Sequence, residues 1–141
     1  MKPVQVVNKV IPTPEQFKAF FAAEEDGGFI MVNLLKFHEK AQYPDGSNPE
    51  MSGSDAYMIY GVAVGDHIKR VGARPLTKGL VTGLMLGEVE ELWDMIALVE
   101  YPSLKAFQTM VMAPDYQEIA RHRDAGLAGQ LNIKIKAAAS G

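Results

Sequence analysis

Two short segments of this chain are apolar on both of the faces that an extended strand presents. Alternate residues of a strand belong to opposite faces, and in segment 29–37 only Asn33 and Lys36 are polar. Segment 93–101 is apolar at nearly every position. Since such runs predict strands that need burial on each side, the sheet that contains them requires cover above and below.

Helix signals surround these strands. Thr13, Pro14 and Gln16 form a capping box with proline in the first turn, which predicts a helix that stops near 26–28. Its phenylalanines share one face and are expected to hold it against the main domain: Phe17, Phe20 and Phe21.

Two more helices are predicted further along. Ser54 is expected to cap one that runs to about Val71, and Ser103 another that is interrupted at Pro114 and ends near Gly126. Glycines 61 and 65 weaken the first of them, and we expect them to allow close packing on the sheet.

The remaining strands are predicted at 80–86 and 131–136, with the acidic segment 87–91 as the turn before the strand at 93–101. Glycines 79, 83 and 87 would leave room for another backbone or a ligand. The long loop 38–53 is rich in turn residues and is either a lid or a surface loop.

The order strand, helix, strand, strand, helix, strand predicts an α+β, ferredoxin-like βαββαβ fold with helices on one face of an antiparallel sheet. The opposite face would then be open and apolar, which favours a homodimer through that face, with a barrel-like space enclosed between two sheets. We expect an N-terminal extension with its helix at 1–27, the ferredoxin-like domain at 28–136, and a frayed tail at 137–141.

Composition excludes several classes of protein. A net charge of −3 argues against a nucleic-acid partner, and no apolar run is long enough to span a membrane, so a cytoplasmic protein is expected. The chain has no cysteine, and its three histidines lack metal-ligand spacing. No phosphate loop or dinucleotide motif is present, so we expect neither metal nor cofactor.

The chain resembles the DUF1330 family of uncharacterised proteins over residues 28–130. The segments that carry the resemblance are Asn33-Leu34-Leu35-Lys36-Phe37, Gly72-Ala73-Arg74, Glu91-Leu92-Trp93-Asp94, Tyr101-Pro102-Ser103, Pro114-Asp115-Tyr116 and His122-Arg123-Asp124-Ala125-Gly126-Leu127. The resemblance implies membership of the dimeric α+β barrel superfamily, with cofactor-free monooxygenases, lactone isomerases and haem-binding proteins as relatives. The family usually has Gly-Gly-Arg where this chain has Gly72-Ala73-Arg74.

His122 and Asp94 are the candidate catalytic residues. Glu118 lies one turn before His122, a pairing that would raise the histidine's pKa. Asp94 is either a general base in an apolar pocket or a strand-end carboxylate paired with Arg74 or Lys36. His38 and His67 are expected to be solvated.

The candidate substrate-binding residues carry polar groups into predicted apolar surroundings: Asn33, Lys36, Tyr60, Arg74 and Arg123. Arg123 lies on the inward stripe of its helix and needs a ligand or a carboxylate, for which Glu100 and Asp94 are the candidates. Asn33 would donate to a ligand carbonyl or satisfy neighbouring backbone.

Three functional hypotheses follow. The first is a homodimer that binds a small aromatic or carbonyl-bearing molecule and acts as a cofactor-free isomerase or oxygenase, which depends largely on analogy with the superfamily. The second is a non-catalytic binding or stress-related dimer whose polar residues form structural pairs. The third, haem binding, requires His122 as the axial ligand.

Overall fold

The computed structural model describes residues 5–23 and 27–136. The tail at 137–141, for which fraying is predicted, lies outside them. The helices and strands follow in the order α1 (Pro14–Ala22), β1 (Phe29–Phe37), α2 (Gly53–Arg70), β2 (Arg74–Leu80), β3 (Met95–Tyr101), α3 (Leu104–Met112), α4 (Pro114–Gly126) and β4 (Leu127–Ile135).

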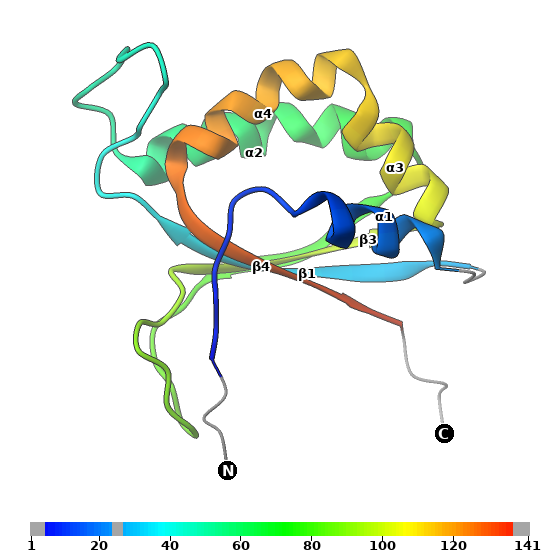
Figure 1. Ribbon diagram of the computed structural model, residues 1–141, viewed down its shortest axis with the longest axis horizontal. Helices are drawn as coiled ribbons and strands as arrows, with labels where there is room; N and C mark the ends of the chain where they lie inside the picture. The colour runs from blue at the N-terminus through cyan, green and yellow to red at the C-terminus, as the bar shows by residue number, and fades with distance from the viewer. Residues whose placement is uncertain (1–4, 24–26, 137–141) are drawn as a thin grey trace.

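The four strands form one antiparallel sheet in the order β2-β3-β1-β4. The long helices α2 and α4 lie over one face of this sheet, and no helix of the described residues covers the opposite face (Figure 1). The predicted ferredoxin-like α+β fold is therefore confirmed.

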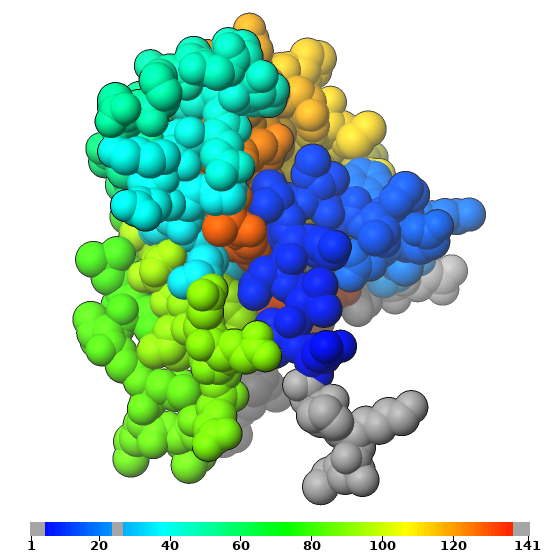
Figure 2. Space-filling view, turned by 60° about the vertical axis from the view of Figure 1, so that its left-hand side comes forward, coloured from blue at the N-terminus to red at the C-terminus, as the bar shows by residue number. Residues whose placement is uncertain are grey.

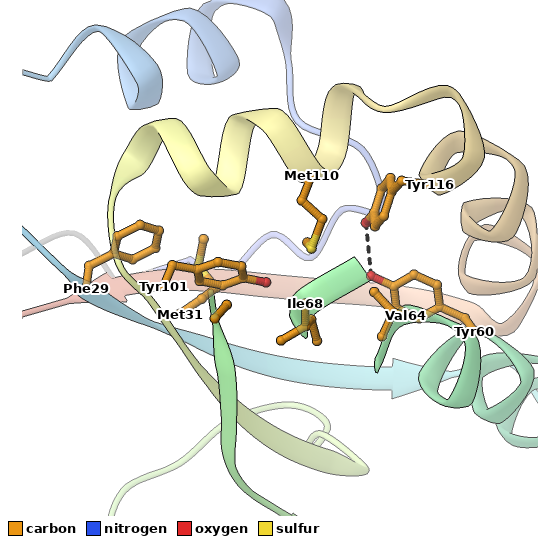
Figure 3. Close-up of a cluster of buried hydrophobic side chains, with 9 residues drawn as sticks. Phe29, Met31, Tyr60, Val64, Ile68, Tyr101, Met110 and Tyr116 are labelled. Carbon is orange, nitrogen blue, oxygen red and sulfur yellow. Dashed lines mark hydrogen bonds between the residues drawn. The ribbon is translucent and has the colours of Figure 1, made fainter. Parts of the chain in front are cut away.

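The main core lies between the helices and the sheet (Figure 3). Phe29 and Met31 of β1 and Tyr101 of β3 are buried there against Ile68 of α2 and Met110 of α3. Phe20 of α1 packs on the edge of this core, with ring centroids 6.1 Å from Phe29 and 6.0 Å from Phe107. Phe20 and Phe21 make ring contacts with the main domain, whereas the Phe17 ring packs on Phe21 within the helix.

The second face of the sheet is apolar, as the doubly apolar strands predict. Val32 is paired with Leu98 on one side and with Ile133 on the other, and paired residues point to the same face. Since Met31 points toward the helices, Val32 and its partners point away from them. Ile133 remains 44% exposed. We call this surface the open face; its apolar members are Ile30, Val32, Leu34, Ile96, Leu98, Leu131, Ile133 and Ile135.

The predicted strand at 80–86 is wrong: the second strand is β2, at Arg74–Leu80. Every residue of this edge strand is exposed, so burial never imposed the apolar alternation by which strands are recognised. Residues 81–94 contain no strand and form an arm, which extends from the sheet on the side of the open face (Figure 1). Two other boundaries differ: β3 begins at Met95 and not at 93, and β4 begins at Leu127 and not at 131.

Two of the three predicted caps are confirmed. The Thr13 capping box is complete, and the Ser103 side chain accepts a hydrogen bond from the backbone N–H of Ala106. The second cap is wrong by two residues, because Ser52 and not Ser54 accepts from the N–H of Asp55 at 3.0 Å.

Close backbone packing occurs at different glycines from those predicted. A Cβ at Gly61, Gly65 or Gly79 would meet nothing within 4 Å, so those positions do not bring segments of this chain together. At the crossing of α2 and α4, by contrast, a Cβ on Gly126 would lie 2.4 Å from the carbonyl oxygen of Gly53. These two helices touch through their backbones because both residues lack a side chain.

Loop 38–52 is attached to the helical layer. Ala41 donates to the carbonyl oxygen of Met51, and Gln42 donates to that of Ala125, both at 2.8 Å. Tyr43 is buried, and Ala41 packs with it against Ala56 and Ala125. The structure therefore supports a packed surface loop at this position, and the buried Ala41 and Tyr43 hold it against α2 and α4.

Candidate functional site

A chain of polar side chains crosses the layer between α4 and the sheet. Arg123 of α4 donates to the Gln130 side-chain oxygen at 2.7 Å, and the Gln130 amide donates to the Asn33 side-chain oxygen at 2.9 Å. Asn33 in turn donates to the carbonyl oxygen of Ala97 at 3.1 Å. The structure thus brings together two predicted residues, Arg123 and Asn33, through Gln130, which the sequence analysis missed.

The partners of Arg123 differ from those predicted. Neither Glu100 nor Asp94 contacts it; it donates instead to Asp124 and to the carbonyl oxygen of Val10, each at 2.8 Å. Val10 belongs to the N-terminal segment, and Lys9 in that segment forms two backbone hydrogen bonds with Gln130. Arg123 therefore holds the N-terminal segment against β4.

Asp94 and Lys36 meet where β1 ends. Asp94 accepts a hydrogen bond from the backbone N–H of Phe37 at 2.8 Å, and its other oxygen lies 4.0 Å from the Lys36 ammonium. Lys36 also donates to the carbonyl oxygen of Leu92 and lies 3.8 Å from Glu91. Of the alternatives for Asp94, this geometry matches the strand-end carboxylate paired with Lys36.

His122 faces loop 38–52 and not the polar chain. Its Nδ1 lies 2.6 Å from the Tyr43 hydroxyl, and Arg121 lies over the Tyr43 ring. Burial lowers the pKa of His122 below its usual 6.5, and the charge of Arg121 lowers it further. The expectation that Glu118 raises this pKa is therefore wrong. In the tautomer with an unprotonated Nδ1, the neutral imidazole accepts a hydrogen bond from the Tyr43 hydroxyl, whose own pKa is raised by burial.

This pKa predicts acid sensitivity. Below about pH 6.5 the unfolded chain takes up a proton on His122 that the folded chain resists, so stability present above that pH is lost as the pH falls. Urea denaturation at a series of pH values measures the slope of the unfolding free energy against pH. We expect His122→Gln, which cannot titrate, to have a shallower slope than the wild type; an unchanged slope would contradict the assignment.

Four tyrosines gather in the helix–sheet layer. The hydroxyls of Tyr60 and Tyr116 are hydrogen-bonded at 2.9 Å, and the Tyr101 hydroxyl points along the layer toward that pair (Figure 3). Tyr57 packs beside Tyr60, with ring centroids 5.4 Å apart. Burial raises the pKa of Tyr57 to about 12 and those of Tyr60 and Tyr101 well above their usual value. Tyr57, Tyr60 and Tyr101 are therefore neutral at pH 7. We call the four tyrosines the tyrosine cluster.

Two hydroxyls of the tyrosine cluster, those of Tyr57 and Tyr101, form no hydrogen bond with another described residue. Within the described parts of the chain, no fully buried polar side-chain atom lacks a partner. The two hydroxyls are therefore within reach of solvent even though their rings are packed in the core. Arg123 lies close enough to affect the pKa values of Tyr57 and Tyr60 electrostatically. Of these four tyrosines, only Tyr60 was predicted from the sequence as a candidate binding residue.

The other predicted residues lie apart from this cluster. Arg74 forms an ion pair with Glu100 at 2.9 Å on the open face. His67 is buried at 7% exposure, and its Nδ1 lies 2.8 Å from Arg70 and 3.9 Å from Asp115. The expectation of a solvated His67 is wrong, because α2 turns this residue toward the Tyr116 ring.

No cluster of three histidine, aspartate or glutamate side chains that could hold a metal is found in residues 5–23 and 27–136. The same residues include no helix of the length and apolar character needed to cross a bilayer.

Comparisons with known proteins agree on the fold and assign no activity. A family model described as a domain of unknown function, DUF1330, matches residues 47–134. No curated protein matches the chain.

Two crystal structures of an RPA0582 protein are similar over nearly the whole chain. The methylated form is 32% identical, with a TM-score of 0.88, and the match covers 96% of this chain and 99% of that one. The other, described as a protein of unknown function from Rhodopseudomonas palustris, is 31% identical, with a TM-score of 0.85, and the match covers 95% and 100% of the two chains.

A dimeric ferredoxin-like protein of unknown function from Bacteroides fragilis shares the fold alone. It is 10% identical, with a TM-score of 0.53, over 78% of this chain and 96% of that one.

Proposed function

This chain belongs to the DUF1330 family, and we propose that it is a homodimer that binds a small aromatic or carbonyl-bearing molecule between its sheet and its helices. The tyrosine cluster supports this proposal. Ligand sites are mostly apolar, with a few polar groups that orient the bound molecule. The core around Tyr57 and Tyr101 has this composition, and their two hydroxyls are not used within the described chain.

In this proposal the polar chain holds the substituent of the ligand. Arg123 is the cation whose charge acts on the hydroxyls of Tyr57 and Tyr60, and Asn33 and Gln130 orient it from the sheet. The Tyr60 hydroxyl is hydrogen-bonded to that of Tyr116, and in this proposal it is a further donor or acceptor for the ligand. Lys36 and Arg74 lie on the other side of the sheet, so they contribute only to the chamber that a second copy would enclose.

Tyr-to-Phe replacements separate binding from packing. Tyr101→Phe removes no hydrogen bond to a described residue, so we expect a change in unfolding free energy of at most about 0.5 kcal/mol. Tyr60→Phe breaks the bond to Tyr116 and is expected to cost about 1 kcal/mol. Chemical denaturation of both variants measures this difference. If Tyr101→Phe cost as much as Tyr60→Phe, its hydroxyl would have a structural partner.

Ligand binding is tested with Tyr101→Phe and with a further variant, Tyr57→Phe. Ligand-observed NMR with a set of benzaldehydes, acetophenones and benzoates should detect at least one binder in the wild type. Tyr101→Phe and Tyr57→Phe are expected to weaken it, while Val62→Ala on the outer surface of α2 leaves it unchanged. Binding unaffected by both tyrosine changes would place the ligand elsewhere and overturn the proposal.

Catalysis is a separate part of the proposal. In a cofactor-free isomerase or oxygenase, His122 or Asp94 would move the proton; His122 lies against Tyr43 and Asp94 at the end of β1, so either would act on a part of the ligand that extends beyond the tyrosine cluster. A non-catalytic dimer is favoured by a specific observation: Arg123, Asn33 and Asp94 all have partners within the chain. Turnover of a bound carbonyl compound, abolished in His122→Ala or Asp94→Asn, would support the enzyme; binding without turnover would support the second function.

A further inference from the structure

The arm formed by residues 81–94 is fixed to the sheet at its base. Val81 donates to the carbonyl oxygen of Asp94 at 2.9 Å, and Asp94 donates to that of Leu35 at 2.7 Å. The Trp93 indole donates to the Asn8 side chain at 2.8 Å, and Lys36 donates to the carbonyl oxygen of Leu92 at 3.1 Å. These four hydrogen bonds set the direction of the arm although its far end touches little of the chain.

The far end of the arm is apolar. Met85 and Leu86 are almost completely exposed, and Leu84 is half exposed. The arm stands clear of the body of the molecule (Figure 2). Three adjacent large apolar side chains held away from their own core mark a contact surface and not a core element. We call residues 84–86 the arm tip.

A shallow groove lies at the base of the same arm. It is lined by residues 77–83 together with Ile96 and Leu98 of the open face. Gly79 and Gly83 have no atom within 4 Å of where a Cβ would stand. The groove therefore offers an apolar floor and two positions without a side chain, which suit bulky side chains such as those of the arm tip.

In two antiparallel arms the tip of each lies beside the base of the other, so the apolar tip of one arm reaches the groove of the other. A twofold axis between two facing sheets produces this arrangement, because it reverses the direction in which each arm extends.

From these features we propose that the arms of two copies are exchanged, with the tip of each seated in the groove at the base of the other. The inference depends on the dimer of the proposed function and adds the arm as the second half of its interface. The open face supplies the flat part of the contact, and the arm tip supplies a separate anchor that sets the relative orientation of the two copies.

The test compares an arm-tip variant, Met85→Asp/Leu86→Asp, with Val62→Asp on the outer surface of α2. Sedimentation velocity of the full chain over a concentration series gives the dimer Kd. We expect the arm variant to weaken the dimer at least about 30-fold and Val62→Asp to change it less than about twofold. Circular dichroism confirms that each variant is folded, as the exposed positions predict.

If the arm-tip variant dimerises with the wild-type Kd, the exchange of arms is overturned and the open-face dimer remains. A wild-type monomer overturns both.

Discussion

Gly126→Ala is expected to lower the free energy of unfolding by about 3 kcal/mol, at the upper end of what overpacking usually costs. The new methyl group would lie 2.4 Å from the carbonyl oxygen of Gly53 and 2.9 Å from the backbone nitrogen of Tyr57. Both obstacles are backbone atoms of α2, so relief requires the two helices to move apart. Thermal and urea denaturation measure the loss.

Gly65→Ala is the matched control. Gly65 lies in α2 with nothing within 4 Å of a Cβ, so alanine there is expected to raise stability by up to about 1 kcal/mol through helix propensity. A stability of Gly126→Ala equal to or above that of the wild type would show that α2 and α4 do not cross as closely as the structure describes.

Ile133→Asp is expected to weaken the dimer at least about 100-fold, which corresponds to about 2.8 kcal/mol. Ile133 lies on the open face beside Val32 and is 44% exposed in the single chain. In a symmetric dimer each substitution occurs twice, and each places a carboxylate in an apolar contact where an isoleucine side chain would have been buried. Sedimentation velocity over a concentration series measures the Kd.

Val62→Asp is again the control for adding a charge to an apolar surface position. Val62 is 79% exposed on the helical side of the molecule, so the same charge there leaves the open face unchanged. If both variants kept the wild-type Kd, the copies would associate through some other surface.

The fold was predictable where burial shaped the sequence. The strand at 29–37 has an apolar pattern on both faces, because helices cover Met31 and its neighbours and the open face carries Val32 and its neighbours. The second strand left no such pattern: β2 is exposed along its whole length. The apolar residues just after it, which resemble a strand, belong to the arm, where Met85 and Leu86 are almost completely exposed.

The candidate site was predictable only residue by residue. Arg123 and Asn33 stood out as polar groups on apolar faces, and the structure joins them through Gln130. Gln130 and Val10 were not predictable as partners of Arg123, because their contacts depend on how the N-terminal segment meets the edge of β4. His122 was expected to pair with Glu118 of its own helix. Its partner is instead the hydroxyl of Tyr43, in a loop 79 residues earlier in the chain.

The mass of the wild-type protein at micromolar concentration, measured by sedimentation equilibrium, tests the central claim most directly. A sheet with Val32, Leu98 and Ile133 on its uncovered side needs a second copy for cover. We therefore predict twice the chain mass of 15.4 kDa. A single-chain mass under these conditions, with the open face left in contact with water, would contradict the account.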